Sequence, residues 1–157
     1  MLVALLCGFL PLLPLIVEKR DYTYFLQPEY FMISFMSLFA ILTTLVRELV
    51  KDMEDAEGDA AAGKLSLVIV LGEKATRSLS VVMLCCTLIL FLAMALTSGD
   101  LLTPIYMSLF LAAPSVILIY KLIRSYRPSS YHKISTGMKF IMVSGLGYIV
   151  LYHYTCL

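Results

Sequence analysis

Six of the eleven acidic residues of this chain fall in one short stretch, Arg47–Gly63, which reads R-E-L-V-K-D-M-E-D-A-E-G-D-A-A-A-G. The stretch directly follows a long apolar run, and carboxylates beside a membrane segment are costly unless a cation binds them. If a single helix continues through the stretch at about 100° per residue, four carboxylates share one face within an arc of about 60°. These four are Glu48, Asp52, Asp55 and Asp59.

Further charged groups surround this row of four carboxylates. Glu54 and Glu57 project from the opposite side of the same helix, whereas Lys51 and Arg47 flank the row. Four aligned carboxylates repel one another, and a divalent cation removes that repulsion. All-oxygen ligands favour Mg²⁺, which normally shares its coordination with substrate phosphates, and adjacent Lys and Arg would hold the remaining phosphate charge. The pattern therefore predicts a diphosphate bound through Mg²⁺ near the membrane surface.

Three other interpretations of the acidic stretch were weighed against this prediction. An EF-hand calcium loop is excluded, because counting from Asp55 puts Ala60 and Ser66 at the positions that require Gly and Glu. A solvated helix end with intrahelical Lys–Glu pairs stays open. A small ion-coupled transporter also stays open, although the other spans offer no acidic partners and Asp100 lies on the opposite side of the membrane.

The composition of the chain indicates an all-α, polytopic transmembrane helical bundle. Of the 157 residues, 61% are hydrophobic and 15% are charged, whereas about a quarter of the residues in a soluble domain are charged. Several apolar windows reach the length of about 20 residues that a membrane-spanning helix needs. There is no basic tract for nucleic acid, and the four cysteines lack metal-ligand spacing.

We expect about five spanning helices in a single transmembrane domain over residues 1–157. The expected spans are Leu2–Val17, Tyr30–Val46, Glu73–Ser98, Leu101–Ile123 and Ser135–Tyr154. The second span should continue as a helix into the acidic stretch and end there, with Gly58 and Gly63 as breakers. The apolar segment Leu65–Leu71 is too short to span and should lie against the bundle as a cap or re-entrant piece.

Two of the later spans carry residues with a structural meaning of their own. Pro114 lies in the middle of the fourth span and should kink it. In the fifth span Ser144, Gly145 and Gly147 offer a close helix–helix contact, which is the usual role of small residues in membranes.

The basic residues predict the orientation of the chain. With five spans, one side of the membrane holds ten of the twelve Lys and Arg residues and the other holds only Lys19 and Arg20. The positive-inside rule places the ten, together with the acidic stretch, in the cytoplasm.

The residues from Arg47 onward also resemble a known family. The run R-E-L-V-K-D-M-E-D-A-E-G-D-A-A-A-G-K-L-S-L-V-I-V-L-G-E-K-A-T-R is similar to the second aspartate-rich motif of the UbiA superfamily of membrane prenyltransferases. The branch that it resembles most includes geranylgeranylglycerol-phosphate geranylgeranyltransferases and their bacterial relatives. The resemblance implies a multi-pass protein of a bacterial or archaeal plasma membrane.

The resemblance also implies an activity and the residues for it. The activity is Mg²⁺-dependent transfer of a prenyl group from a prenyl diphosphate to a lipid-soluble, aromatic or glycerol-phosphate acceptor. Metal binding falls to Asp55 and Asp59, with Asp52 as an acidic neighbour; diphosphate binding falls to Arg47, Lys51 and Lys64, and Glu48 supports the site. Among these, Lys51, Asp55 and Asp59 are the expected catalytic residues, because metal and lysine would stabilise the departing diphosphate.

The sequence departs from the family pattern in two ways. Ala60, Leu65 and Val68 stand where Arg, a basic residue and Pro are common. In addition, the family has nine transmembrane helices and a first motif of the form N-D-x-x-D-x-x-x-D, which does not occur in this sequence. We therefore expect a carboxyl-terminal half that cannot catalyse the reaction alone. A non-catalytic membrane fragment, or a subunit that needs an amino-terminal partner half, is the alternative.

The remaining polar residues have mainly structural interpretations. His132 is expected at the surface of a basic loop and His153 at the far membrane face. Arg124, Arg127 and Lys133 should set the topology and contact anionic lipids, with phosphate binding as the alternative.

Overall fold

The computed structural model describes residues 28–124 and 128–156, and every regular element in this part of the chain is helical. The elements are α3 (Pro28–Ala61), α4 (Leu67–Leu71), α5 (Glu73–Thr97), α6 (Leu102–Tyr106), the π-helix η3 (Met107–Ala112), α7 (Ala113–Arg124) and α8 (Pro128–Cys156). The predicted all-α class is confirmed. The first expected span, Leu2–Val17, lies outside the described residues.

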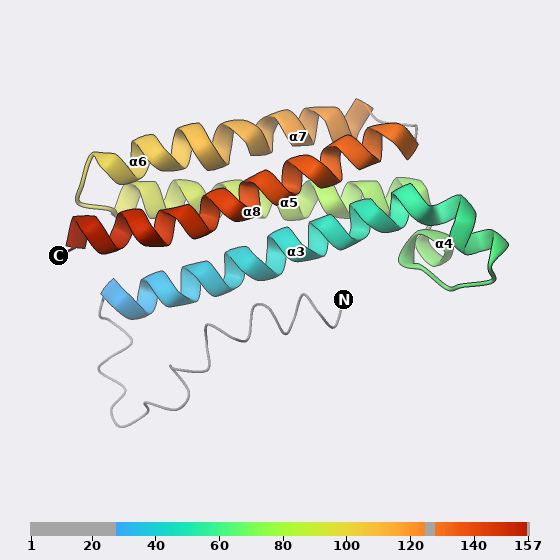
Figure 1. Cartoon of the computed structure of the whole chain (residues 1–157), viewed down its shortest axis with the longest axis horizontal. Helices are drawn as coiled ribbons and strands as arrows, with labels where there is room; N and C mark the ends of the chain where they lie inside the picture. Colours follow the sequence, from blue (N-terminus) through green and yellow to red (C-terminus); the bar gives the residue numbers. More distant parts are fainter. Residues whose placement is uncertain (1–27, 125–127, 157) are drawn as a thin grey trace, which may run out of the picture.

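Among the described residues, four helical stretches are long and apolar enough to cross a membrane. They cover residues 32–61, 73–97, 102–124 and 129–152. α3 packs against α5 and α8, and α7 packs against the same two helices, so that the four stretches form one bundle (Figure 1). The chain is an integral membrane protein with a polytopic helical bundle.

One end of this bundle collects the charged segments. Figure 1 shows that α3 and α7 end there and that α5 and α8 begin there, with α4 beside the end of α3. Contacts between side chains of α8 and those of α3 and α5 confirm the arrangement. We call this the charged end of the bundle.

The interior of the bundle combines large apolar residues with small hydroxylic ones, whereas the outward faces are apolar. Phe39, Phe91 and Tyr148 are buried, while Leu92 and Val143 are more than half exposed. Several buried hydroxyls donate hydrogen bonds to the preceding turn of their own helix. These bonds include Thr43 to Phe39, Ser80 to Thr76 and Ser115 to Leu111. Such hydroxyls satisfy themselves within the helix and permit close packing between helices in an apolar medium.

The small residues of α8 make the close contact that the sequence predicts. A Cβ atom on Gly145 would overlap the Phe39 ring of α3, and one on Gly147 would lie 2.8 Å from the Tyr106 hydroxyl. That hydroxyl donates to the backbone oxygen of Ser144 over 2.8 Å. The prediction for these three residues of α8 is confirmed.

The helix that contains Pro114 includes a π-helical segment shortly before the proline. The π-helix η3 ends two residues before Pro114, at Ala112, and joins α6 to α7. Proline has no N–H to donate and clashes with the preceding turn, and a π-helical segment is one way in which a helix absorbs that disturbance. At the start of α6, Asp100 Oδ2 accepts the Thr103 N–H over 2.9 Å.

The end of α3 corrects one prediction. Gly58 does not break the helix, which continues to Ala61, because the surrounding alanine and glutamate residues favour helix strongly. After the helix ends, Gly63 adopts a φ of +67°. Gly63 N–H donates to Ala60 O over 3.2 Å and Lys64 N–H to Asp59 O over 3.0 Å. These two bonds form a Schellman motif, in which glycine supplies the left-handed residue.

The beginning of α8 also differs from the expected boundary. The helix starts at Pro128 rather than near Ser135. Hydropathy marks only the apolar part of a helix, whereas proline is favoured in the first helical turn and starts this one in its polar part. Two polar residues of the added turns, Tyr131 and His132, make the contacts described below.

Candidate functional site

The predicted row of carboxylates lies on one continuous helix. Because α3 is helical through the whole acidic stretch, the spacing argument for Glu48, Asp52, Asp55 and Asp59 applies to the folded chain. Asp55 is exposed, and the other three are half-buried. The row therefore lies at the charged end of the bundle, where water and ions can reach it.

Part of the row faces a cavity of about 260 Å³ between α3 and α4. Charged side chains from α3 line it together with apolar ones from α3 and α4. The lining residues are Leu45, Glu48, Leu49, Lys51, Asp52 and Leu67. The structure thus brings together Glu48, Lys51 and Asp52 as the sequence predicts, and it places an apolar wall beside them.

Lys64 and Asp59 lie at the far end of the row. Their Nζ and Oδ1 atoms are 3.5 Å apart, and the Lys64 side chain is 72% exposed. Such an exposed pair contributes little to stability. Lys64 nevertheless lies close to Asp59, one of the predicted metal ligands. Of the other predicted cations, Arg47 is half-buried and Lys51 is exposed. Lys51 lines the cavity, whereas Arg47 and Lys64 do not.

The carboxylates of α3 suit a metal site that is completed by water and phosphate better than a site formed by protein ligands alone. In the described part of the chain, no three His, Cys, Asp or Glu residues lie close enough together to hold a metal ion. Residues four apart on a helix are separated by about 6 Å along the axis, whereas Mg²⁺ holds its oxygens at about 2.0–2.1 Å. One or two carboxylates of α3 can reach one Mg²⁺, and water and phosphate oxygens normally complete its shell. The all-oxygen donor set fits Mg²⁺.

The opposite side of α3 makes a different kind of contact. Glu54 Oε1 lies 2.8 Å from His132 Nδ1 of α8. The His132 side chain is 72% exposed, which agrees with its predicted surface position. The contact confirms that Glu54 faces away from the carboxylate row and toward the bundle.

Other predicted residues lie away from the site. Arg124 lies over the ring of Tyr120, with 4.6 Å between the guanidinium carbon and the ring centre. Lys133 is exposed on α8. Arg127 and the side chain of His153 lie outside the described part of the structure.

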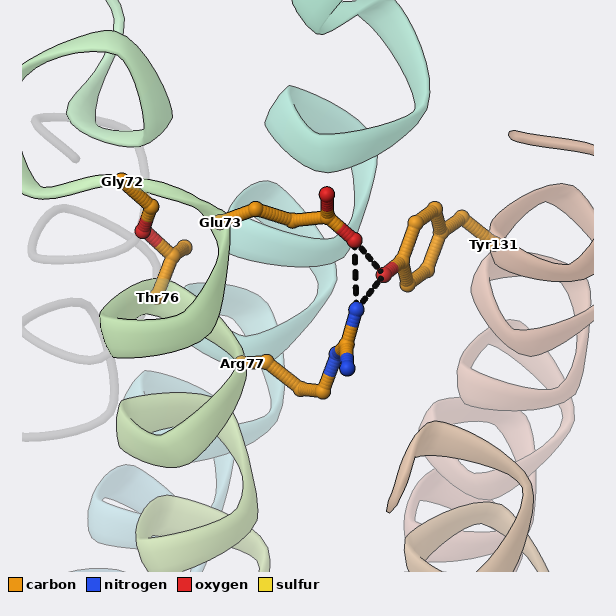
Figure 2. A network of polar contacts seen from close by, with 5 residues as sticks. All are labelled: Gly72, Glu73, Thr76, Arg77 and Tyr131. Carbon is orange, nitrogen blue, oxygen red and sulfur yellow. Dashed lines mark hydrogen bonds and ion pairs between the residues drawn. The ribbon is translucent and has the colours of Figure 1, made fainter. Parts of the chain in front are cut away.

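Sequence reasoning missed a polar network that ties α5 to α8 at the charged end (Figure 2). Arg77 Nη2 donates to Glu73 Oε1 over 2.5 Å and to the Tyr131 hydroxyl over 2.8 Å. The Tyr131 hydroxyl in turn donates to Glu73 Oε1 over 2.6 Å. Arg77 and Tyr131 are buried, whereas the Glu73 side chain is 48% exposed.

The sequence carried a partial signal for this network. Glu73 and Arg77 stand four residues apart, which is the spacing of an intrahelical ion pair. The third member, Tyr131, is 54 residues further along the chain than Arg77, and no local pattern links the two. Thr76, in the same turn, donates its hydroxyl to Gly72 O over 3.1 Å and secures the start of α5.

Comparison with known proteins agrees with the membrane bundle and its acidic row. Residues 1–145 match the UbiA prenyltransferase family. A digeranylgeranylglyceryl phosphate synthase of Methanosphaera stadtmanae is 32% identical over 110 residues, which cover 69% of this chain and 40% of that protein. A protein of the same name from Methanopyrus kandleri is 58% identical over 36 residues, which cover 23% of this chain and 13% of its own length. The matches thus span well under half of each relative.

No solved structure matches the chain. The family match extends over most of the sequence, and it includes both the carboxylate row of α3 and the network of α5 and α8. The chain belongs to the UbiA prenyltransferase family.

Proposed function

We propose that the charged end of α3 binds Mg²⁺ and the diphosphate of a prenyl diphosphate, in an enzyme that transfers the prenyl group to a hydrophobic or amphiphilic acceptor. One observation carries the proposal beyond family membership. The cavity between α3 and α4 joins Glu48, Lys51 and Asp52 to the apolar side chains of Leu45 and Leu67. A prenyl diphosphate has the same two-part character, with a charged head and an apolar tail.

The carboxylates and cations of α3 have separate tasks in this proposal. Mg²⁺ would be held by one or two of Asp52, Asp55 and Asp59 at a time, and when bound it would neutralise diphosphate charge and stabilise the leaving group. Arg47, Lys51 and Lys64 hold the phosphate oxygens that the metal does not reach. Glu48 stands beside Asp52 in the cavity wall and supports the site.

The reaction that these groups support is a substitution at the first carbon of the prenyl chain. The allylic C–O bond breaks and its electron pair leaves with the diphosphate, whose growing charge Lys51 stabilises at the cavity wall. The acceptor oxygen or carbon forms the new bond and loses a proton. The apolar residues of the wall keep water from the allylic cation.

The acceptor proposed first is a prenylated glyceryl phosphate. This choice is supported by the name digeranylgeranylglyceryl phosphate synthase, which both relatives carry. An aromatic or quinone-type acceptor is the alternative within the same reaction class.

A second candidate is a subunit that completes its site with a partner half. It is favoured by the finding that α3 gathers no group of three ligands among the described residues. The two candidates share the same binding site and differ in whether the chain turns over by itself.

The experiment places the whole chain in lipid nanodiscs and measures Mg²⁺-dependent release of diphosphate from labelled geranylgeranyl diphosphate. A parallel sample measures binding of the labelled substrate. We expect Asp55→Asn and Asp59→Asn to abolish Mg²⁺-dependent binding, whereas Glu57→Gln, on the exposed opposite side of α3, leaves it unchanged.

The two readouts separate the two candidates. Binding with release supports a complete enzyme, and binding without release supports a subunit that needs a partner half. Binding that survives both aspartate substitutions would overturn the site.

A further inference from the structure

The short helix α4 and the residue Leu65 before it present an apolar face outward at the charged end of the bundle. Four large side chains make up this face: Leu65, 86% exposed; Val70, 67%; Leu71, 51%; and Ile69, 39%. Only Val68 of the helix is buried. In water, a contiguous apolar patch at the surface is unusual and marks a site of contact. We call these four residues the α4 face.

The position of the α4 face favours a lipid surface as its occupant. α4 ends at Leu71, and the spanning helix α5 begins at Glu73. The outward side of α5 continues with exposed apolar residues such as Leu79 and Val82. The α4 face is thus followed along the chain, after the turn at Gly72 and the polar first turn of α5, by the apolar surface that the bundle presents to lipid.

The charges beside the α4 face suit the same occupant. Lys64 and Lys74 stand at its two ends, and both are exposed. Apolar side chains flanked by lysines are typical of segments that lie in the membrane interface, where the lysines meet anionic head groups.

Two glycines set the direction of the segment. Gly63, before it, has φ +67°, and Gly72, after it, has φ +83°. Both values lie in the left-handed region, which glycine adopts without strain. The chain therefore turns sharply at each end of the segment 64–71, which lies beside the end of α3 instead of lengthening α3 or α5 (Figure 1).

We propose that α4 is a membrane-docking helix, with Leu65, Ile69, Val70 and Leu71 inserted at the boundary between lipid head groups and acyl chains. Its inward side packs on α3 and α5, and Leu67 lines the cavity that also contains Glu48, Lys51 and Asp52. One helix thus separates the cavity from the membrane interface. The cavity would then lie at the level of the lipid head groups, where the polar head of a membrane-bound amphiphile could enter it.

The test uses an environment-sensitive fluorophore on single cysteines. Cys7, Cys85, Cys86 and Cys156 are first replaced by Ala. Val70→Cys and Leu71→Cys place the label on the α4 face, at two positions so that a folding defect at one does not decide the result. The matched control is Ala62→Cys, an exposed position directly after the end of α3. Each protein is reconstituted in vesicles of phosphatidylcholine with phosphatidylglycerol.

The expected result is a blue-shifted emission at positions 70 and 71, with strong quenching by a nitroxide high on the lipid acyl chain and weak quenching by aqueous iodide. The control at position 62 should show the reverse. Iodide quenching at 70 and 71 equal to that at 62 would overturn the proposal. Protection from both quenchers would overturn it as well, because protein and not lipid would then cover the face. No substrate is involved, so the result is independent of prenyl transfer.

Discussion

The charged end of the bundle contains two groups of ionisable residues that are built in opposite ways. On α3, four carboxylates share one face, and two of them, Glu48 and Asp52, border a cavity. Between α5 and α8, Glu73, Arg77 and Tyr131 satisfy one another, and two of the three are buried. Opposite charges that meet across helices hold the helices together. Like charges in a row have no such use, and we propose that they instead bind a cation.

This contrast predicts that the two groups respond differently to mutation. Substitutions in the carboxylate row and its cations should remove ligand binding and leave the fold unchanged. Substitutions in the network should destabilise the fold and leave the affinity of the folded protein for its ligand unchanged.

The largest effect is expected at Lys51. Lys51→Met should lower Mg²⁺-dependent prenyl transfer by about 100-fold or more, because it removes a charge that stabilises the leaving diphosphate. Diphosphate release in nanodiscs is the measurement. Lys139→Met, which removes an equally exposed lysine of α8, is the control and should have no effect. Equal losses in both variants would mean that overall charge, and not the site, matters. If the wild-type chain does not turn over, binding of the labelled diphosphate replaces release as the readout.

The next effect is expected at Arg77. Arg77→Met should lower the free energy of unfolding by about 2 kcal/mol, because it removes two hydrogen bonds of a charged donor while Glu73 stays partly hydrated. Tyr131→Phe should have a smaller effect, of about 1 kcal/mol. Denaturant unfolding in mixed micelles measures both. An unchanged unfolding curve with lost substrate binding would reverse the roles assigned to the two groups.

Alanine substitutions at two glycines compare the loosely surrounded end of α3 with the closely packed interior of the bundle. Gly145→Ala should destabilise the protein by about 1–3 kcal/mol, because its Cβ would overlap Phe39. Gly58→Ala meets no atom within 4 Å and should stabilise the helix by about 0.5–1 kcal/mol. The same unfolding assay compares them, and a loss of stability in Gly58→Ala would show that the acidic end is packed.

The smallest effect is expected at the link between α3 and α8. His132→Ala removes the partner of Glu54, but the histidine is 72% exposed, and such pairs contribute less than about 1 kcal/mol. Substrate binding should be unchanged. A large loss of stability would show that this contact holds helices together, as the network of Glu73, Arg77 and Tyr131 does.

The sequence was most informative where a pattern is local. Helical spacing placed Glu48 and Asp52 on one face, and the structure brings both to one cavity. The small residues of α8 predicted its close packing because their size alone permits it. Family membership followed from the motif around Asp55 and Asp59 and is confirmed by the family match.

The sequence was least informative where two distant segments of the chain meet, and where helix-forming and helix-breaking residues stand next to one another. Tyr131 joins Glu73 across 58 residues, and nothing near Tyr131 indicates its partner. Leu67 lines the cavity only because α4 folds back on α3. Gly58 was expected to end α3, but strong helix formers on both sides outweigh one exposed glycine, and the left-handed turn falls at Gly63. The Mg²⁺ ligands and the cytoplasmic orientation stay predictions.

The central claim is that the carboxylate row of α3 binds a divalent cation together with a diphosphate. Mn²⁺ can stand in for Mg²⁺ and be titrated by electron paramagnetic resonance, with geranylgeranyl diphosphate present, in nanodiscs. The decisive comparison is between two double variants that remove the same charge from opposite sides of one helix, Asp55→Asn with Asp59→Asn and Glu54→Gln with Glu57→Gln. We predict that the first pair abolishes diphosphate-dependent Mn²⁺ binding and that the second retains it. Equal Mn²⁺ binding by the two double variants would contradict the assignment, because the total negative charge of the helix end, and not the position of the carboxylates, would then determine binding.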